Sequence, residues 1–212
     1  MKVIELNKTI TESNDKDAAL LRKELKEQQM ELVNVMSSPG SGKTTLLSRM
    51  IQDMGDKRQI GVMEADIASE VDAIRIEKLG AKAIQAHTDG MCHMDAGMTA
   101  RAMRALLEEK SLDLIFLENV GNLICPAEFD TGATMNMMIL SVPEGDDKPL
   151  KYPLMFEKSD VLVITKMDTL EYFDFDLELC CERVKRLNPK IKIFPVSAKT
   201  GKGMTELENF ML

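Results

Sequence analysis

The sequence predicts an α/β fold with a mostly parallel sheet that carries helices on both faces. Apolar runs of strand length alternate with helical patterns along most of the 212 residues. The glycine-containing segment Ser37–Thr45 lies between an apolar run and a helical pattern, which is typical of a phosphate-binding loop. Further short polar motifs follow other apolar runs, as expected where parallel strands end and ligands bind.

The predicted elements follow from spacing and composition. Asp15–Gln29 carries apolar positions at helical spacing among many charges, which predicts an amphipathic helix. We therefore divide the chain into an N-terminal helical arm, residues 1–30, and one domain, residues 31–212. Strands are predicted from short apolar runs at 32–36, 59–64, 81–85, 112–117, 138–142, 161–165 and 191–196. Helices are predicted between them, near 44–54, 69–79, 95–110, 174–187 and 203–211, where strong helix formers dominate.

Composition restricts the possible partners and surroundings. A hydrophobic content of 44% allows one sizeable core without disulfide bonds. The net charge of −8 gives no basic surface for nucleic acid, so we expect no nucleic-acid partner. No apolar run approaches the roughly 18 residues of a membrane helix, and we expect a cytoplasmic protein without a membrane partner. The four cysteines are then interpreted as thiols or metal ligands.

The phosphate-binding loop has the spacing of a P-loop, with Ser37 in place of its first glycine. Its backbone N–H groups and the helix that follows favour an anion. Lys43 is expected to reach the β- and γ-phosphates, and the hydroxyl of Thr44 to bind Mg²⁺. The predicted nucleotide contacts in this loop are Ser38, Gly40, Ser41, Gly42, Lys43, Thr44 and Thr45.

Two further motifs are those of a nucleotide-hydrolysing switch. Asp66 follows a predicted strand and is our preferred carboxylate for Mg²⁺, with Asp72 as the alternate. Glu118 ends another strand and is expected to bind Mg²⁺ through water, while the N–H of Gly121 senses the γ-phosphate. Lys43, Asp66, Glu118 and Gly121 are the predicted catalytic residues. Because no glutamine follows Gly121 to position water, hydrolysis is expected to be slow.

A guanine-binding motif is predicted at Thr165-Lys166-Met167-Asp168. The carboxylate of Asp168 can accept the ring N–H and the exocyclic amine of guanine, a pair that adenine lacks. Ser197-Ala198-Lys199 matches the loop that approaches the guanine O6. Thr165 stands where an asparagine normally contacts guanine and braces the phosphate loop, so we expect specificity to persist and affinity to fall.

A metal site is predicted from Cys92, His93 and Cys125, whose thiolates and imidazole suit Zn²⁺ or Ni²⁺. The alternative interpretation is two structural cysteines and an unrelated histidine. Cys125 is four residues after Gly121, a link of at most about 14 Å, so nucleotide state can reach a metal ligand. Three ligands leave the coordination incomplete, and a symmetric dimer would complete it. His87 could join the site but is interpreted as an incidental loop histidine, and Cys180 and Cys181 are assigned no role.

The phosphate loop, the Cys92-His93 pair and the string Glu118-Asn119-Val120-Gly121-Asn122-Leu123-Ile124-Cys125-Pro126 resemble the nickel-insertion GTPases of hydrogenase maturation, the HypB family. The resemblance covers about residue 30 to the end of the chain. It implies a P-loop NTPase of the dimerising, SIMIBI-like GTPase class, which binds GTP/GDP and Mg²⁺ and handles Ni²⁺ or Zn²⁺. It also implies a homodimer, a separate nickel-binding accessory protein and the large subunit of [NiFe]-hydrogenase as partners.

Three alternatives remain at this point. One is a urease-type or other metal-accessory GTPase, although the metal motif expected of the urease type is Cys-Pro-His. Another is a nucleotide-gated metal-binding protein without turnover. A P-loop kinase is disfavoured by Asp168 and by the lack of a recognisable phosphoacceptor pocket.

Overall fold

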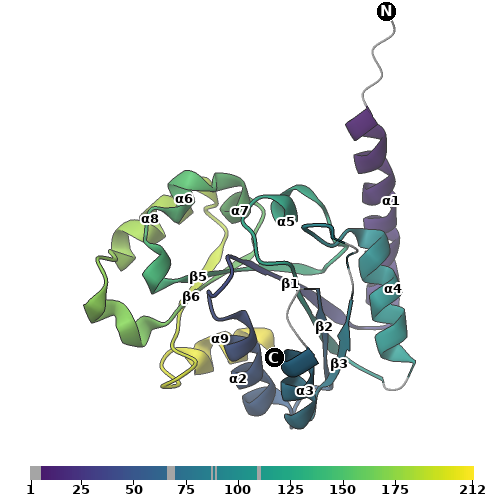
Figure 1. Ribbon diagram of the computed structural model, residues 1–212, viewed down its shortest axis with the longest axis horizontal. Coiled ribbons are helices and arrows are strands. Elements are labelled where there is room, and N and C mark those ends of the chain that lie inside the picture. Colours follow the sequence, from purple (N-terminus) through teal and green to yellow (C-terminus); the bar gives the residue numbers. More distant parts are fainter. Residues whose placement is uncertain (1–5, 66–69, 87, 89, 109–110) are drawn as a thin grey trace, which may run out of the picture.

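Seven parallel strands form the central sheet, in the order β3-β2-β4-β1-β5-β6-β7 (Figure 1). The computed structural model describes residues 6–65, 70–86, 88, 90–108 and 111–212, and it describes no side chains for 6–11 and 70–73. The strands are β1 (Glu31–Ser37), β2 (Ile60–Glu64), β3 (Lys82–Gln85), β4 (Leu114–Glu118), β5 (Met135–Ser141), β6 (Val161–Thr165) and β7 (Lys192–Pro195). The predicted α/β fold class is confirmed.

Helices cover both faces of the sheet (Figure 1). One face packs against α2 (Lys43–Met54), α3 (Glu70–Lys78) and α9 (Met204–Met211). The other face packs against α1 (Leu6–Glu27) and α4 (Ala96–Leu107) near β2 and β4, and against α7 (Pro153–Glu157) and α8 (Leu177–Leu187) near β5 and β6. Within the described residues, none of the helices is both long and apolar enough to cross a membrane.

Helix α1 is longer than predicted and belongs partly to the core. It begins at Leu6 and ends at Glu27, whereas the sequence predicted Asp15–Gln29. Its Leu21 and Leu25 side chains are fully buried against the sheet and α4. The division of the chain at residue 30 stays a prediction.

Strand β5 begins three residues earlier than its apolar run, at Met135. The reason is Asn136, a polar residue that interrupts the hydrophobic pattern but pairs in register with Asn34 of β1. The Asn34 amide donates to the Asn136 side-chain oxygen at 3.0 Å, so the polar groups satisfy each other inside the sheet.

The sequence did not predict five short helices: α5 (Cys125–Glu128), α6 (Lys148–Lys151), α7, η1 (Val142–Glu144) and η2 (Met167–Tyr172). Segments of three to six residues cannot display a helical hydrophobic period. Proline occupies the first turn of four of them, where its fixed φ is favourable.

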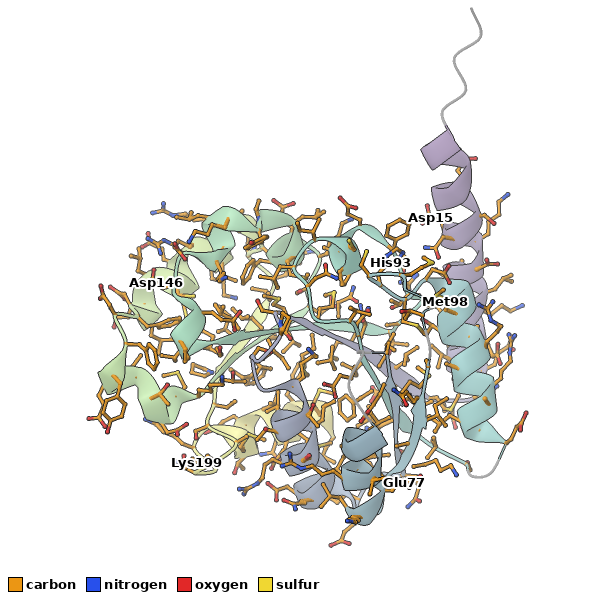
Figure 2. The ribbon with its side chains drawn as sticks, viewed as in Figure 1. Asp15, Glu77, His93, Met98, Asp146 and Lys199 are labelled. Atoms are coloured by element: carbon orange, nitrogen blue, oxygen red, sulfur yellow. The ribbon has the colours of Figure 1, made fainter. Side chains whose placement is uncertain are left out.

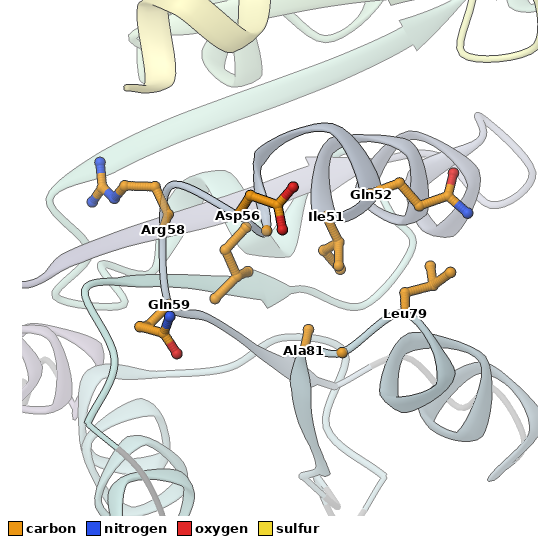
Figure 3. A pocket seen from close by; sticks show the side chains of 10 residues that line it. Ile51, Gln52, Asp56, Arg58, Gln59, Leu79 and Ala81 are labelled. Carbon is orange, nitrogen blue, oxygen red and sulfur yellow. The ribbon is translucent and has the colours of Figure 1, made fainter.

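Because every strand pair is parallel, all carboxyl ends meet at one edge of the sheet. Ser37, Glu64, Glu118 and Thr165 are the last residues of their strands and lie along this edge. A cavity of about 240 Å³ lies instead by the amino end of β2, between Gly55–Ile60 and Leu79–Ala81 (Figure 3). The predicted nucleotide motifs therefore gather at the edge opposite that cavity.

Candidate functional site

The phosphate-binding loop connects β1 to α2 as the sequence predicted. Gly40 and Gly42 have φ values of 75° and 99°, in the left-handed region that residues with a Cβ rarely adopt. Helix α2 begins at Lys43, directly after Gly42, so its first N–H groups face the loop. This arrangement can bind a phosphate anion.

Ser37 has a specific function in place of the usual glycine. Its buried hydroxyl accepts hydrogen bonds from the Lys43 ammonium at 3.2 Å and the Ser41 hydroxyl at 2.7 Å. It donates in turn to the backbone carbonyl of Ser38 at 2.8 Å. The serine therefore connects three points of the loop and orients the lysine that is predicted to reach phosphate.

Two predicted magnesium ligands are in direct contact. The Thr44 hydroxyl donates to a Glu118 carboxylate oxygen at 2.9 Å. Hydroxyl and carboxylate oxygens are the ligands that Mg²⁺ prefers, so this pair fits the ion. Asp66 lies outside the described residues, and so does the side chain of Asp72.

Glu64 is a buried carboxylate that sequence reasoning assigned no role. It ends β2 and pairs in register with Glu118 of β4, so both side chains leave the same side of the sheet. Glu64 is 2% exposed and Glu118 4% exposed. Glu64 is the last residue of an apolar strand and lies two residues before Asp66, and this position is the sequence signal that could have identified it as a candidate site residue.

Gly121 lies against the phosphate loop. A Cβ built at this position would be 3.2 Å from both Cγ and N of Pro39. Only glycine permits this approach without displacing the loop backbone. The predicted γ-phosphate sensor is therefore in contact with the phosphate-binding loop.

The predicted guanine motifs come together after β6 and β7. The Ser197 hydroxyl, which is buried, donates to a carboxylate oxygen of Asp168 at 2.7 Å. This hydrogen bond holds the pKa of the Asp168 carboxyl below its ordinary value and favours the charged acceptor that guanine needs. Lys166, with φ 60°, crosses to the carbonyl of Gly40 at 2.7 Å. Ala198 is half-buried and Lys199 is exposed.

Thr165 braces the phosphate loop although it lacks the amide of the usual asparagine, and the expected loss of affinity stays a prediction. Its hydroxyl donates to the backbone carbonyl of Ser41 at 2.7 Å, and the residue is 3% exposed. A hydroxyl is shorter than an amide, but β6 lies close enough to the loop for it to reach. The role of this position in contacting guanine stays a prediction.

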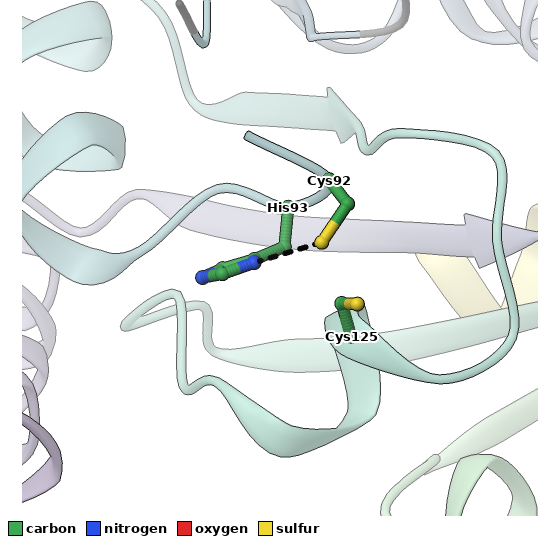
Figure 4. Close-up of side chains that lie close together, drawn as sticks. All are labelled: Cys92, His93 and Cys125. Atoms are coloured by element: carbon green, nitrogen blue, oxygen red, sulfur yellow. Dashed lines mark hydrogen bonds between the residues drawn. The ribbon is translucent and has the colours of Figure 1, made fainter. Parts of the chain in front are cut away.

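Cys92, His93 and Cys125 form a cluster whose ligand atoms all lie within 4.8 Å of one another (Figure 4). The Cys92 sulfur is 3.7 Å from His93 Nδ1. Cys92 and His93 precede α4, whereas Cys125 begins α5. Two sulfurs and one imidazole nitrogen are a donor set for Zn²⁺ or Ni²⁺.

Burial and a thiol–thiol hydrogen bond shift the pKa values of two members of this cluster. His93 is 6% exposed and stacks on Phe129 with 3.8 Å between ring centroids. Burial lowers the pKa of His93, which favours the neutral imidazole that binds metals. A hydrogen bond with Cys92, followed by burial, raises the pKa of the Cys125 thiol. Metal binding must therefore displace a proton from this cysteine.

Two asparagines that sequence reasoning did not single out lie beside the metal cluster. Asn122 donates to the Cys92 carbonyl and accepts from the Cys125 N–H. Asn119 is fully buried and accepts from the Met94 N–H at 3.3 Å. Both belong to the string between Glu118 and Cys125, but a sequence cannot show which backbone groups they contact.

The metal cluster and the base end of the nucleotide site are far apart. Figure 2 shows His93 and Lys199 on different sides of the molecule.

Cys180 is buried in α8, where burial raises its thiol pKa to about 12, and Cys181 is half-buried beside it. Neither α8 cysteine is a member of the cluster.

Comparison with known proteins identifies the family. The nucleotide-binding domain of the CobW/HypB/UreG family matches residues 31–195. The hydrogenase maturation factor HypB of Azotobacter chroococcum mcd 1 is 44% identical over 207 residues, which cover 97% of this chain and 67% of that protein. The crystal structure of HypB from Helicobacter pylori in complex with nickel superposes with a TM-score of 0.88 at 40% identity, covering 94% of this chain and 93% of the other.

A more distant structural likeness concerns the fold alone. The signal recognition particle receptor FtsY from Elizabethkingia anophelis has a TM-score of 0.55 at 11% identity, covering 84% of this chain and 65% of that chain. The two chains therefore share the same α/β fold. By its matched domain and its relatives, the chain belongs to the CobW/HypB/UreG family of nucleotide-binding proteins, among the HypB hydrogenase maturation factors.

Proposed function

We propose that the protein is a GTP-hydrolysing metallochaperone for [NiFe]-hydrogenase maturation. In this function, GTP binding and dimerisation control the binding and delivery of nickel, with zinc as the competing ion. The observation that carries the proposal is the Cys92–His93–Cys125 cluster, because its member Cys125 lies four residues after Gly121, a glycine in contact with the phosphate loop. A nickel complex of a similar protein supports the choice of metal.

GTP is proposed to bind along the carboxyl edge of the sheet. Lys43 neutralises the β- and γ-phosphates, and Asp168 accepts the two guanine N–H groups. Thr44, Glu118 and Asp66 would hold Mg²⁺, which supplies positive charge where negative charge develops during phosphoryl transfer. The remaining proposed nucleotide contacts are Ser38, Gly40, Ser41, Gly42, Thr45, Thr165, Lys166, Ser197, Ala198 and Lys199.

Hydrolysis is proposed to be slow because Asn122 and Leu123, rather than a glutamine, follow Gly121. A slow reaction suits a switch, because the GTP-bound state then lasts long enough for partners to bind. The proposed partners are a second copy of the chain, a separate nickel-binding accessory protein and the hydrogenase large subunit. The names of the relatives as hydrogenase maturation factors support the last of these.

Replacing the two cluster cysteines tests the metal site. A Cys92→Ala/Cys125→Ala variant is expected to lose bound Ni²⁺ or Zn²⁺ and to keep its GDP affinity, measured by metal analysis and calorimetry. Cys181→Ala is the matched control, because it removes a half-buried thiol outside the cluster. Unchanged metal stoichiometry in the double variant would exclude this assignment.

Phosphate release separates an enzyme from a nucleotide-gated metal store. At saturating GTP, with and without Ni²⁺, the proposal expects slow multiple turnover. Lys43→Ala is expected to abolish release, since Lys43 is the buried cation of the phosphate loop. Release of no more than one phosphate per protein would favour the store.

A further inference from the structure

We propose that Asn122 is a positioning residue that transmits nucleotide state to the metal cluster. This inference rests on the proposed function, because it concerns how the same two sites are connected. Asn122 directly follows Gly121, the residue packed against the phosphate loop, and its side chain contacts the backbones of both cluster cysteines.

Three hydrogen bonds define the role of the Asn122 side chain. Its Nδ2 donates to the Cys92 carbonyl at 2.5 Å. Its Oδ1 accepts from the Cys125 N–H at 2.9 Å and from the Ile124 N–H at 3.1 Å. One carbonyl on one side and two N–H groups on the other fix the orientation of the amide. The amide thus joins the Cys92 segment to the turn that carries Cys125.

This side chain is a major polar connection between the two segments. Within the described residues, no backbone–backbone hydrogen bond joins residues 91–93 to residues 122–125. The thiols of Cys92 and Cys125 also interact, but metal binding replaces that contact with metal–sulfur bonds. The Asn122 bridge survives metal binding, because it uses backbone groups.

The residue that follows the Cys92–His93 pair, Met94, is hydrogen-bonded to the core. The fully buried Asn119 accepts from the Met94 N–H and donates to Asn34 of β1 at 2.9 Å. That anchor is buried in the core, where the same Asn119 oxygen also accepts from the Val120 N–H at 2.8 Å, whereas the Asn122 contact with Cys92 is exposed. A displacement at residues 121–122 therefore moves Cys92 and Cys125 relative to a fixed point beside His93.

The close approach of Gly121 to the phosphate loop connects such a displacement to nucleotide binding. The space beside Gly121 is already filled by the Pro39 backbone and ring. A γ-phosphate that is held by this loop and accepts a hydrogen bond from the Gly121 N–H acts on a backbone that already touches the loop, so a change of nucleotide is passed to the residues that follow. The next side chain along the chain is that of Asn122.

The test measures nickel affinity in two nucleotide states. Dissociation constants for Ni²⁺ are determined with GDP and with a non-hydrolysable GTP analogue, and their ratio is the coupling. In Asn122→Asp a side-chain oxygen can still accept from the Ile124 and Cys125 N–H groups, but the N–H donor to the Cys92 carbonyl is lost. Asn122→Ser loses that donor without adding charge, so it separates the loss of the bridge from an electrostatic effect.

We expect both variants to bring the coupling ratio to within about twofold of one, while wild type departs further from one. A purely structural role would weaken nickel binding equally in both states and preserve the ratio. Asn188→Ser is the control, because its amide also donates to backbone carbonyls, at Phe156 and Ser159, outside both sites. It is expected to keep the wild-type ratio.

The outcomes separate the two proposals. A wild-type ratio of one overturns the proposed coupling, and this inference with it. A wild-type ratio well away from one that persists in Asn122→Asp and Asn122→Ser overturns the role of Asn122 and leaves the proposed function intact.

Discussion

At the scale of single residues, the site depends on small hydroxyls that hold the groups predicted to contact nucleotide. Ser37 orients Lys43, Thr165 holds the loop carbonyl of Ser41, and Ser197 holds Asp168. Each hydroxyl is buried, so water cannot replace it when it is removed. Changes at these positions are therefore expected to alter nucleotide binding through the groups that these hydroxyls hold.

Thr165→Val tests the brace on the phosphate loop. Valine has a similar shape but no hydroxyl, so the Ser41 carbonyl loses its donor. A neutral hydrogen bond contributes about 1 kcal/mol, and GDP affinity measured by calorimetry is expected to fall roughly threefold to tenfold. Thr165→Asn, which supplies an amide, is the comparison and is expected to bind at least as tightly as wild type. Equal affinities in wild type and Thr165→Val would show that the loop keeps its shape unaided.

The Asp168–Ser197 contact makes a prediction about pH. The ordinary pKa of this carboxyl is 3.8, and the Ser197 hydrogen bond lowers it. Asp168 therefore stays ionised as the pH falls to its ordinary pKa, and guanine binding weakens only when the pH passes through the lowered pKa. The contribution of this contact to folding stability follows the same sign: it is present above pH 3.8 and lost through the lowered pKa.

Ser197→Ala removes the first cause of that shift, so the pKa of Asp168 rises toward its ordinary value. The pH at which GDP affinity falls on acidification is therefore expected to be higher in this variant. A fluorescent GDP analogue measures the affinity, and circular dichroism checks that the variant is folded. If GDP affinity falls at the same pH in wild type and Ser197→Ala, a group other than Asp168 controls the loss of binding.

At the scale of elements, α1 shows how a charged helix becomes part of the core. Its exposed face carries most of the charge, while Ala18, Leu21 and Leu25 are buried against α4 and the sheet. Arg22 adds contacts to Asp130 at 2.6 Å and to the Ala133 carbonyl at 2.9 Å. These contacts attach α1 to the segment between α5 and β5.

Leu25→Ala tests how much this helix stabilises the fold. Truncating a fully buried leucine is expected to lower the free energy of unfolding by about 2–5 kcal/mol, measured by urea denaturation. Leu20→Ala is the matched control on the same helix, where the side chain is 66% exposed and a change within about 0.5 kcal/mol is expected. Similar losses in both variants would argue against a core role for α1.

Long elements with a clear hydrophobic period were predictable, and short or polar ones were not. The strand Val161–Thr165 is almost entirely apolar, and Glu31–Ser37 contains the largely apolar segment 32–36, so composition alone indicates both. Met135 and Asn136 were missed because the compensating contact of Asn136 comes from another strand. Local sequence carries no information about that partner.

The candidate site was predictable to the extent that it consists of motifs. Cys92, His93 and Cys125 were named from ligand chemistry, and the fold brings them together. Glu64, Asn119 and Asn122 were missed because their importance arises from register and from backbone groups distant in the chain. The contact of Thr165 with the loop was not predicted, because the reach of its hydroxyl depends on the separation of β6 from the loop.

At the scale of the whole molecule, the string Glu118–Cys125 connects the predicted nucleotide site to the metal cluster. It begins at Glu118, which with Thr44 is the pair predicted to bind Mg²⁺, passes the phosphate loop at Gly121 and ends at Cys125 of the metal cluster. Cys92 is exposed and Ile124 is 57% exposed, so the cluster lies open to the surface. A second copy of the chain can therefore approach the cluster.

The incomplete donor set leads to a prediction about oligomeric state. Three protein ligands do not satisfy Zn²⁺ or Ni²⁺, and a two-fold axis beside the cluster would bring a second equivalent set. GTP is expected to favour the same dimer, because the Gly121 segment joins the nucleotide to the cluster. Light scattering with GDP or a non-hydrolysable GTP analogue, each with and without Ni²⁺, is expected to give the largest mass with the analogue and Ni²⁺ together. The Cys92→Ala/Cys125→Ala variant should lose the metal-dependent increase and keep the nucleotide-dependent one. If wild type has one mass in all four conditions, the two sites do not communicate through dimerisation, and delivery must depend on a change within one chain.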